Sequence, residues 1–557
     1  MNDTSRDIDN PLIRALCDPD RYPHDVGPVR IIETHISWVL LTGSYAYKIK
    51  KPVHLPFVDF STLRRRLVYC EEELRLNQRL APDLYMGVVP IGGSIESPVI
   101  GAQPAIEYAV KLREFPPGAR LDERVRAGEA PVEDIRELAQ TMADFHTSLP
   151  ASRSFGNPVE ITRAALGNLK QTEHVLEQSV PREELSRLRE WITRSCVKLE
   201  HVFAERQRAG AIREGHGDLH LENLVYWDRR IVPFDALEFD PRLRWIDVID
   251  EVAFLVMDLM AHDEAGLGNE FLNRYLEVTG DYAALEVFKF YLVHRALVRA
   301  KVAAIKGSQQ KRSEARGAAR ATAERYLHCA GRLIGPAEPL LVITHGLSGS
   351  GKTTATSQLI SRLPAIRCRS DLERKRLHGL APEERSGSGL GAGLYATDST
   401  RTTYASLRRH AALGLRAGLN VVVDATFLRR AERESFNRLA AEERARFAIL
   451  DFSASESVLR QRIEQRTAQG GDASEATSEV LAHQLATQEP FDAEELPFVV
   501  AVNTDQEVEL DELERQLNLS RPPRRARASR PTGRPSSPSR ARDESQPFSD
   551  SPPDPSR

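Results

Sequence analysis

The 557-residue sequence is poor in the features that mark secreted or membrane proteins. It has five cysteines, at positions 17, 70, 196, 329 and 368, and no C-x-x-C pair. Scattered cysteines in an odd number supply neither a disulfide framework nor a zinc site, and they suit a reducing compartment. No apolar run approaches the ~20 residues that a membrane-spanning helix needs. The first residues lack the basic start and apolar core of a signal peptide. The sequence predicts a cytoplasmic protein without a membrane partner.

Neither sign of charge dominates the chain. The formal net charge is −4 at pH 7, with 28% charged and 41% hydrophobic residues. This balance is typical of an ordinary globular protein and argues against a global nucleic-acid-binding surface. A chain of this length is too long for a single hydrophobic core, so several domains are expected.

Three regions differ in residue pattern. Residues 1–330 begin with strand-like segments such as THISWVLL and YAYKIKK and continue mainly as helix, which predicts a two-lobed α+β domain. Residues 337–517 alternate strand and helix, and their five apolar strands predict an α/β domain with a parallel five-stranded sheet. Residues 518–557 consist largely of Pro, Ser and Arg and are expected to be disordered.

The second region carries a glycine-rich motif, GLSGSGKT, between the apolar segment LLVIT and a helical pattern. Strand, glycine-rich loop and helix in this order predict a P-loop, whose backbone N–H groups surround phosphate oxygens at a helix N-terminus. Lys352 is expected to reach the β- and γ-phosphates of ATP, and Thr353 to hold Mg²⁺. The expected ATP-binding residues are Gly346, Ser348, Gly349, Ser350, Gly351, Lys352, Thr353 and Thr354.

Five further charged residues of this region favour a kinase. Asp371 follows a strand and could accept a proton from an attacking hydroxyl, and Arg374, one helical turn later, could hold the acceptor. Asp424 ends the strand NVVVD, a position suited to Mg²⁺ or its bound water. Arg462 and Arg466 share one helical face before TAQGGDASEAT, which is predicted to be a mobile lid. Arginines there could neutralise charge on the transferred phosphoryl group, although a surface ion pair is an equal alternative for each.

These motifs resemble the small P-loop kinases of the nucleoside-monophosphate-kinase type, close to the gluconate-kinase, zeta-toxin and polynucleotide-kinase group. The resemblance rests on GLSGSGKT, SDLERKR, VVVDATF and RQRIEQR…DASEA. It implies that Asp371 and Arg374 form an acceptor-activating pair like that of polynucleotide kinases.

In the first region, HGDLHLEN has the spacing of a kinase-type catalytic loop. Asp218 lies where the catalytic base would be, and Asn223 lies where one Mg²⁺ is bound. NLVYWDRRIVPFD predicts a hairpin that returns Asp235 to Asn223 as a second Mg²⁺ ligand. His216 is expected to fix the loop backbone, and His220 receives no role.

The lysine of this first ATP site has two candidates. Lys48 and Lys50 lie on the same face of the strand-like YAYKIKK, and Lys48 is preferred. Its acidic partner could be Glu71, Glu72 or Glu73 on the following helix, and Glu73 is preferred.

These residues resemble the aminoglycoside phosphotransferase-like family, the small-molecule branch of the protein-kinase fold. HGDLHLEN and FDALEFDPRLRWIDVIDEVAFLVMDL carry most of the match. No glycine-rich loop precedes the lysine and FDALE replaces D-F-G, which fits that branch and argues against protein substrates. The whole chain resembles bacterial fusions of such a domain with a P-loop ATP-binding domain. This implies two sites that each use ATP and Mg²⁺ to phosphorylate a hydroxylated small molecule, whose identity the fold does not fix.

Two alternatives stay open beside a bifunctional enzyme, in which the sites could act separately or be coupled. One is a regulatory P-loop ATPase with a catalytically silent first domain. The other is a polynucleotide 5′-hydroxyl kinase that uses the nine arginines of residues 521–557 to hold the polymer. A nucleic-acid partner is ranked below a small molecule, because the P-loop region has neither a basic groove nor a run of stacking aromatics.

Overall fold

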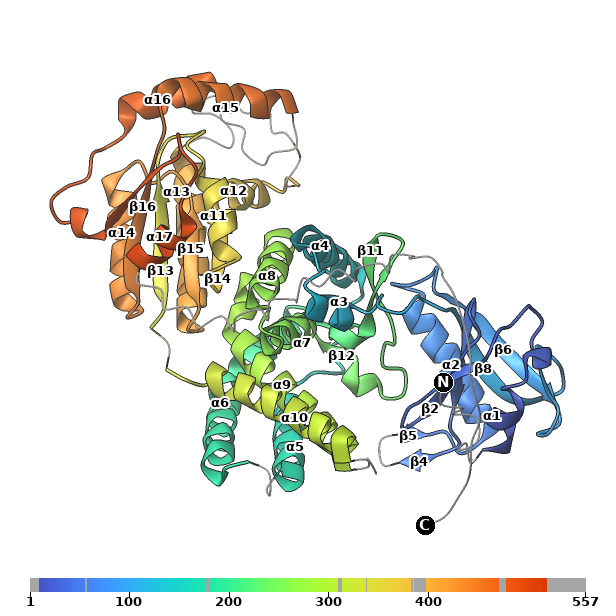
Figure 1. The fold of residues 1–557 in the computed structure, drawn as a ribbon. Helices are drawn as coiled ribbons and strands as arrows, with labels where there is room; N and C mark the ends of the chain where they lie inside the picture. The colour runs from blue at the N-terminus through green and yellow to red at the C-terminus, as the bar shows by residue number, and fades with distance from the viewer. Residues whose placement is uncertain are drawn as a thin grey trace, which may run out of the picture.

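A computed structural model describes residues 10–55, 58–176, 180–308, 313–336, 338–381, 384, 397–469 and 477–517. The tail at 518–557 and the centre of the expected lid, 470–476, lie outside the described residues. Figure 1 shows three parts in chain order: a β-rich lobe, a helical lobe and an α/β domain. The first two parts are the two lobes expected of a kinase-like domain.

A six-stranded antiparallel sheet, in the order β1-β2-β3-β8-β6-β7, forms the β-rich lobe. Alternation along β3 buries Tyr47 and Ile49 in a core with the amino-terminal segment. Lys48 and Lys50 occupy the opposite face, toward α2 (Leu63–Asn77). The other elements of this lobe are α1 (Pro11–Ala15), η2 (Pro19–Arg21), β1 (Arg30–Glu33), β2 (Ser37–Leu41), β3 (Tyr45–Lys50), β4 (His54–Leu55), β5 (Val58–Asp59), β6 (Tyr85–Gly93), β7 (Pro98–Ile100) and β8 (Ala105–Arg113).

Helix α7 (Val248–Ala261) lies in the core of the helical lobe. Its sequence, VIDEVAFLVMDLMA, is apolar on most sides, as expected of a helix that others surround, and nearly all its residues are buried. The remaining helices of the lobe are α3 (Leu121–Ala127), α4 (Val132–Ser148), α5 (Pro158–Leu176), α6 (Arg182–Arg208), α8 (Ala265–Thr279), α9 (Leu285–Ser308) and α10 (Ser313–Leu333).

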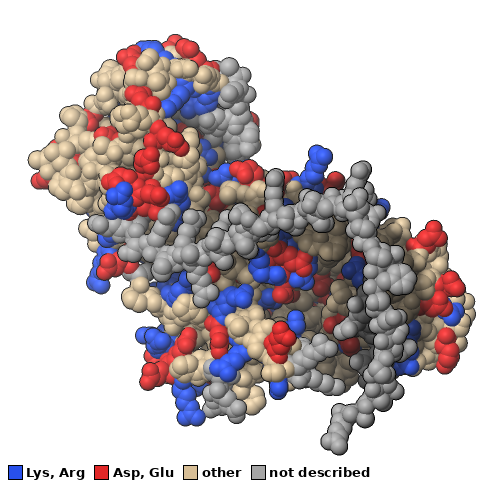
Figure 2. All heavy atoms as spheres, in the orientation of Figure 1, with Lys and Arg blue, Asp and Glu red and all other residues tan. Residues whose placement is uncertain are grey.

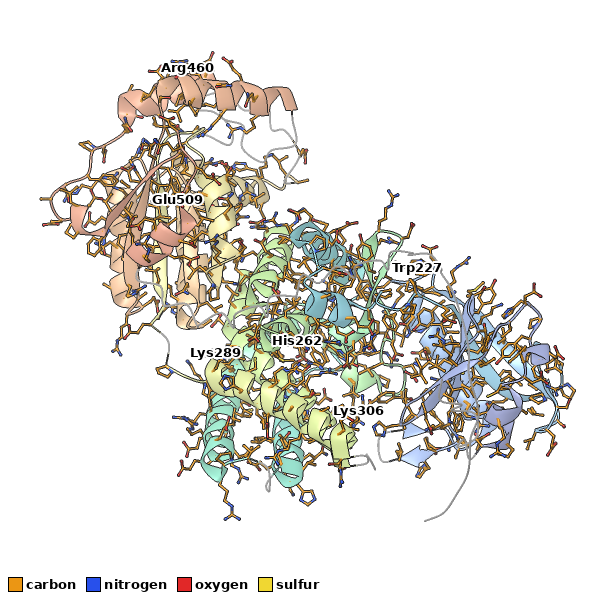
Figure 3. The ribbon with its side chains drawn as sticks, in the orientation of Figure 1. Trp227, His262, Lys289, Lys306, Arg460 and Glu509 are labelled. Carbon is orange, nitrogen blue, oxygen red and sulfur yellow. The ribbon has the colours of Figure 1, made fainter. Side chains whose placement is uncertain are left out.

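The predicted hairpin after the kinase-type loop is present as β10 (Leu224–Trp227) and β11 (Arg230–Pro233). Its two turn residues, Asp228 and Arg229, both have positive φ, which matches the twist of a two-residue hairpin. Trp227 marks the turn end in Figure 3. The smaller elements of this lobe are β9 (Ile212–Glu214), η3 (Leu221–Asn223), η4 (Pro241–Leu243), β12 (Trp245–Asp247) and η5 (Tyr282–Ala284).

The α/β domain contains the predicted parallel five-stranded sheet, in the order β14-β15-β13-β16-β17. Residues of β13 alternate between two cores, with Leu340 and Val342 against α11 and α17 and Leu341 and Ile343 against α13 and α14. The strands of the α/β domain are β13 (Leu340–His345), β14 (Ala365–Arg369), β15 (Asn420–Asp424), β16 (Arg446–Ser453) and β17 (Val499–Asn503). Its helices are α11 (Lys352–Ile360), α12 (Ser370–Leu377), α13 (Thr397–Arg416), α14 (Arg430–Glu442), α15 (Glu456–Gln469), α16 (Ser478–Thr487), η7 (Leu496–Phe498) and α17 (Leu510–Gln516).

The first domain covers the edge strand β14 of the second domain. The side chain of Asn273, in α8, donates to the carbonyl oxygen of Ala365 at 2.8 Å and accepts from the backbone N–H of Arg367 at 2.6 Å. The Tyr282 hydroxyl donates to the carbonyl oxygen of Arg367 at 3.2 Å. An uncovered edge strand presents unpaired backbone N–H and C=O groups. These contacts give such groups of β14 hydrogen-bond partners and at the same time join the two domains.

Charges of both signs are interspersed over the face shown in Figure 2. This distribution agrees with the net charge of −4. In the described part of the chain, no helix combines the length and apolar character that a bilayer crossing requires.

Candidate active sites

The motif GLSGSGKT forms a loop between β13 and α11, as its order in the sequence predicts. Gly346, Gly349 and Gly351 all have positive φ, and Gly351 caps the start of α11. A Cβ atom at Gly346 would lie 2.5 Å from the carbonyl oxygen of Phe452, and one at Gly349 would lie 2.8 Å from that of Leu459. Only glycine therefore fits these two positions, and the loop takes the shape that phosphate binding requires.

The Lys352 ammonium group lies against this loop. Its Nζ donates to the carbonyl oxygens of Gly346 and Leu347, both at 2.8 Å. Burial lowers the pKa of Lys352 to about 8, and Asp424 and Asp371 only partly oppose the effect. A phosphate beside Nζ would stabilise the charged lysine, so the group fits the role expected of it.

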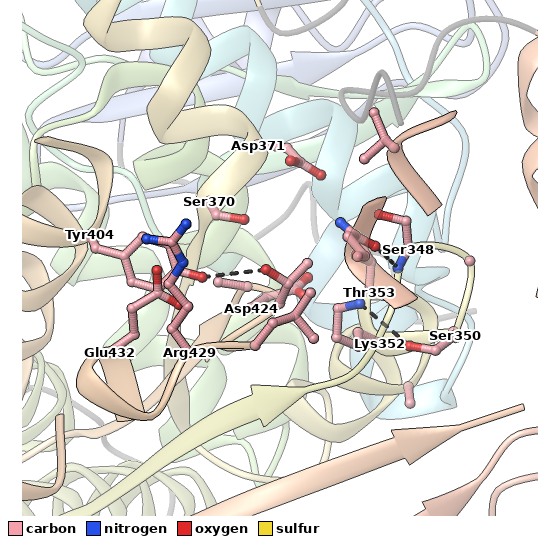
Figure 4. A pocket seen from close by; sticks show the side chains of 18 of the residues that line it. Ser348, Ser350, Lys352, Thr353, Ser370, Asp371, Tyr404, Asp424, Arg429 and Glu432 are labelled. Atoms are coloured by element: carbon pink, nitrogen blue, oxygen red, sulfur yellow. Dashed lines mark hydrogen bonds between the residues drawn. The ribbon is translucent and has the colours of Figure 1, made fainter. Parts of the chain in front are cut away.

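One large cavity, of about 1340 Å³, contains most of the residues predicted for this site. Figure 4 shows Asp371 and Lys352 projecting toward it from different elements. Among the predicted residues, those that line it are Ser348, Gly349, Ser350, Gly351, Lys352, Thr353, Thr354, Asp371, Arg374, Asp424, Arg462 and Arg466. The fold thus brings the phosphate loop and the predicted acceptor residues to one space.

The two predicted carboxylates occupy different parts of the cavity wall. Asp371 lies in the first turn of α12, and its Oδ1 is 3.6 Å from Nη1 of Arg374. Asp424 ends β15, and its Oδ2 accepts from the Thr356 hydroxyl of the P-loop helix at 3.5 Å. Asp424 is therefore tied to α11, whereas Asp371 belongs to the element that follows β14.

Two of the three arginines of α15, Arg462 and Arg466, were predicted to act at this site. Arg462 donates to the carbonyl oxygen of Gly349 at 3.3 Å and to the hydroxyl and carbonyl oxygens of Thr504 at 2.9 and 2.7 Å. Thr504 also donates to the carbonyl oxygen of Ser350 at 3.0 Å. Arg462 therefore fixes the P-loop backbone, and both Arg462 and Arg466 line the cavity. The sequence offered no signal for Thr504, since only the fold brings it to the loop.

Part of the cavity wall was not predicted from the sequence. Figure 4 shows Tyr404, Arg429 and Glu432 together, across the pocket from the P-loop. Burial raises the pKa of Glu432, and Arg429 only partly opposes the effect. Arg408 also lines this space and pairs with Glu442 at 2.6 Å. These residues lie on α13 and at the start of α14, outside any recognisable motif.

In the kinase-like domain, Lys48 and Lys50 share one acidic partner. Glu73 Oε1 lies 2.8 Å from Lys48 Nζ, and Glu73 Oε2 lies 2.7 Å from Lys50 Nζ. Lys48 also pairs with Asp235, and Lys50 pairs with Glu238 at 2.5 Å. Both lysines thus belong to the site, and Glu73 is the glutamate of the three candidates that faces them.

The buried charges of this cluster stabilise one another. Burial opposes ionisation of Glu73, but Lys48 and Lys50 outweigh it and hold the pKa of Glu73 well below its usual range. Burial also disfavours the charged form of Lys48, yet Asp235 and Glu73 raise the pKa of this lysine well above its usual value. Glu238 differs, because burial, aided by the charge of Glu73, raises its pKa despite Lys50.

The kinase-type loop places Asp218 and Asn223 in contact. The Asn223 amide donates to Asp218 Oδ2 at 2.9 Å. The hairpin returns Asp235 to this point, since the Phe234 N–H donates to the Asn223 carbonyl oxygen at 3.0 Å. Asp235 has a φ of 63°, and its N–H donates to the Tyr85 hydroxyl at 3.1 Å. The three residues predicted from spacing are therefore neighbours.

Two histidines support the loop. His216 Nε2 lies 2.8 Å from the carbonyl oxygen of Phe234, in line with its predicted structural role. His220 Nε2 lies 3.2 Å from Asp218 Oδ2 and 3.2 Å from Nη1 of Arg299. Burial opposes ionisation of Asp218, but His220 and Arg299 outweigh it and hold the pKa of Asp218 below its usual value. The contact of His220 with Asp218 was not anticipated, although its position two residues later was a usable signal.

Each site offers only a partial set of protein ligands for Mg²⁺. Among the residues that the structure describes, no group of three or more His, Cys, Asp or Glu side chains is arranged to hold a metal ion. Mg²⁺ in kinases is commonly held by one or two carboxylates together with phosphate oxygens and water. Asn223 with Asp235, and Thr353 with Asp424, supply that kind of partial ligand set.

Solved kinase structures resemble parts of the chain. A choline kinase from Cryptosporidium parvum Iowa II is 12% identical, with 58% of this chain and 96% of that chain covered and a TM-score of 0.36. An ADP-bound aminoglycoside phosphotransferase is 13% identical, with 59% and 99% covered and a TM-score of 0.34. A gluconokinase from Sinorhizobium meliloti 1021 is 25% identical, with 33% and 91% covered and a TM-score of 0.23.

Sequence relatives span both domains. A family model described as an AAA domain matches residues 341–491. The uncharacterized proteins Rv2004c of Mycobacterium tuberculosis (strain ATCC 25618 / H37Rv) and Mb2027c of Mycobacterium bovis (strain ATCC BAA-935 / AF2122/97) are each 32% identical over 496 residues. These matches cover 87% of this chain and 95% of each relative. The chain therefore belongs to the family of these mycobacterial proteins, as a fusion of an aminoglycoside phosphotransferase-like domain with a P-loop kinase-like domain.

Proposed function

We propose that the protein is a bifunctional ATP-dependent phosphotransferase, in which each domain transfers the γ-phosphoryl group of ATP to a hydroxyl acceptor. The observation that carries the proposal is the cavity of about 1340 Å³ that joins Lys352 of the phosphate loop to Asp371 and Arg374. A simple ATPase needs room for water beside the phosphates, whereas this cavity extends to α13 and α14 and has space for a second substrate.

In the P-loop site, Asp371 is the group proposed to take the proton of the acceptor hydroxyl. Lys352 would hold the β- and γ-phosphates, and Thr353 and Asp424 would hold Mg²⁺, which supplies charge neutralisation when bound. Arg466 would face the charge that develops on the transferred group. Phosphoryl transfer depends mostly on such positioning and electrostatic stabilisation.

The far wall of the cavity favours an acceptor that carries negative charge. Arg374, Arg408 and Arg429 line this space. Tyr404 and Glu432 lie beside them and can exchange hydrogen bonds with hydroxyl groups. Guanidinium groups bind carboxylate and phosphate oxygens with defined geometry. We therefore propose a small hydroxylated anion as the acceptor of the P-loop domain.

In the kinase-like site, Asp218 is the group proposed to receive or orient the acceptor hydroxyl. Lys48 would turn from Asp235 to the phosphates of ATP, and Asp235 and Asn223 would hold Mg²⁺. The contact of Asp218 with Asn223 and His220 fixes the carboxylate in place. Its low pKa keeps it ionised at neutral pH, as acceptance of a hydrogen bond from a hydroxyl requires.

The test is an untargeted search for the phosphorylated product. The whole protein is incubated with a cell extract and γ-labelled ATP, and labelled compounds are separated and identified. We expect labelled small molecules that disappear in an Asp218→Asn/Lys352→Ala double variant. A label pattern identical for the wild type and the double variant would contradict the proposed function.

Two rival functions make different predictions. A regulatory ATPase with a silent first domain has no need of a complete Asp218, Asn223 and Asp235 set, which makes this rival less favoured. A polynucleotide kinase should bind a 5′-hydroxyl oligonucleotide with an affinity that falls steeply as salt rises. Deletion of residues 521–557 should then weaken binding and flatten its salt dependence. If the full-length protein neither binds nor phosphorylates the oligonucleotide at low salt, the small-molecule acceptor stands.

A further inference from the structure

One arginine of the P-loop domain is bonded to the kinase-like domain and to the P-loop helix. Arg367 lies in β14, and its Nη2 is 2.7 Å from Oε1 of Glu277 in α8 of the first domain. The same guanidinium donates to the hydroxyl of Ser357 in α11. Arg367 and Glu277 are both buried, with 7% and 5% of their side chains exposed. The pair therefore connects α8 to β14 and α11. Because it is buried, loss of either partner would leave the other charge without compensation.

The same end of α8 also holds the helix that carries Asp371. Arg376 of α12 donates to the carbonyl oxygen of Glu277 at 2.7 Å and pairs with Glu373. Glu373 in turn accepts from the Ser406 hydroxyl at 2.5 Å and contacts His410 at 3.1 Å. These contacts of Glu373 and Arg376 hold α12 in place, and Asp371 of the same helix lines the cavity.

The two fastened helices carry the two halves of the proposed reaction. Helix α11 begins with Lys352 and Thr353 of the phosphate loop, and α12 carries Asp371 and Arg374 of the acceptor side. Their relative placement sets the distance between the transferred phosphoryl group and the attacking hydroxyl. A displacement of about 1 Å in such an arrangement can lower the rate of transfer by about 100-fold.

From these contacts we infer that Glu277, a residue of the kinase-like domain, is a positioning residue for phosphoryl transfer in the P-loop domain. Its carboxylate acts through Arg367 and Ser357 on α11, while its backbone carbonyl oxygen accepts from Arg376 of α12. The inference rests on the function proposed for the P-loop site. It also means that the second site is complete only when the first domain is docked against it.

The inference is tested with Glu277→Gln in the full-length chain, with Asp218→Asn present to silence the first site. The neutral amide keeps the shape of the side chain but removes the ion pair with Arg367. We expect kcat for transfer by the P-loop site to fall about 10-fold or more, because the acceptor and phosphate groups are no longer held in register. The dissociation constant for ATP should stay within about threefold, because the loop backbone supplies most phosphate contacts.

Glu270→Gln is the matched control. Glu270 lies on the same helix, is 4% exposed and pairs at 2.8 Å with Arg136 inside the first domain. Glu270→Gln should lower kcat far less than Glu277→Gln, because its bonded partner lies in the first domain and only its longer-range charge reaches Arg367. Ser357→Ala removes the link to α11, so the Glu277→Gln/Ser357→Ala double variant should lose no more activity than the stronger single variant. Fully additive losses would contradict a shared route through Arg367.

Amide hydrogen exchange gives a readout that does not depend on turnover. We expect faster exchange in residues 352–360 of Glu277→Gln, but not of Glu270→Gln; residues 370–377 should change little, because the backbone carbonyl oxygen that accepts from Arg376 is kept. Unchanged exchange in residues 352–360, or equal loosening of this helix in both variants, overturns the inference. If Glu277→Gln does not fold, Glu277→Asp replaces it, which keeps the charge and should give the same changes to a smaller extent. Absence of transfer in the Asp218→Asn parent would overturn the proposed function instead, while the exchange result still decides this inference.

Discussion

Lys48 and Lys50 each hold one oxygen of the same Glu73 carboxylate, at 2.8 and 2.7 Å. Lys50 is completely buried and also holds Glu238 at 2.5 Å, whereas Lys48 is 14% exposed and reaches Asp235. The two lysines therefore have separable tasks. Lys48 can turn to phosphates while Lys50 continues to neutralise Glu73 and to anchor the segment that follows Asp235.

The first prediction separates these lysines. Lys50→Met should lower the free energy of unfolding by about 3–5 kcal/mol, because it leaves Glu238 buried without its cation. Lys48→Met should lower kcat of the first domain about 100-fold or more and destabilise less, because Glu73 keeps Lys50. Urea unfolding and transfer assays measure the two effects. The double variant Lys50→Met/Glu238→Gln removes both charges and should recover part of the lost stability, and equal unfolding midpoints for wild type and Lys50→Met would refute the assignment.

The second prediction concerns pH and Lys352. Burial lowers the pKa of this lysine from 10.5 to about 8 in the free protein, and bound phosphates should raise it again. Binding of ATP above pH 8 therefore takes up a proton, and affinity should fall by up to about tenfold per pH unit as pH rises from 8 toward the pKa of the complex. Between pH 8 and 10.5 the unfolded chain binds more protons than the free folded protein, so the contribution of Lys352 to stability becomes more favourable as pH rises.

Calorimetric titration with ATP at pH 7, 8 and 9 measures this linkage. The Lys48→Met substitution is present to weaken ATP binding by the first domain. Lys352→Arg is the control, since a guanidinium stays charged throughout this range and its binding should be far less sensitive to pH. An ATP affinity that is the same at pH 7 and pH 9 would falsify the assignment of a lowered pKa to Lys352.

The third prediction concerns the independence of the two chemical steps. Asp218→Asn should abolish transfer by the kinase-like domain and leave the P-loop activity within about twofold, because the substitution preserves the shape and fold of the loop. Lys352→Ala should do the reverse. Product analysis for each variant distinguishes the two activities. Loss of every ATP-dependent activity in either single variant would contradict two separate reaction centres.

The fourth prediction separates the arginines of α15. Arg462→Ala should weaken ATP binding about tenfold and destabilise the domain by about 1–3 kcal/mol, because Arg462 bonds Gly349 and Thr504. Arg466→Ala should lower kcat about 10-fold or more with little change in ATP affinity. Arg460, which Figure 3 labels on the same helix, pairs with Glu456 at 2.7 Å and is 44% exposed. Arg460→Ala should leave both quantities unchanged, and a similar loss of ATP affinity in all three variants would point to general loosening of α15.

The sequence alone determined the elements whose signals are local. The P-loop follows from glycine spacing between a strand and a helix, and the parallel sheet follows from five apolar segments separated by helices. A loop and a hairpin of fixed length bring together Asp218, Asn223 and Asp235, so their proximity does not depend on contacts between distant parts of the chain. In each case the residues that act together are close in sequence or meet at the ends of neighbouring strands.

The distant groups that complete the sites come together only through tertiary packing. Lys50 and Glu238 are 188 positions apart, and Arg367 and Glu277 are 90 apart. The acidic candidates Glu71, Glu72 and Glu73 are adjacent in sequence, and only the packing of α2 against β8 and β6 turns Glu73 toward the lysines of β3. The covering of β14 by Asn273 likewise follows from how the helical lobe docks on a sheet edge. A buried charge or backbone group must find a partner, but the partner is chosen by the packing of whole elements, which no local pattern in the sequence records.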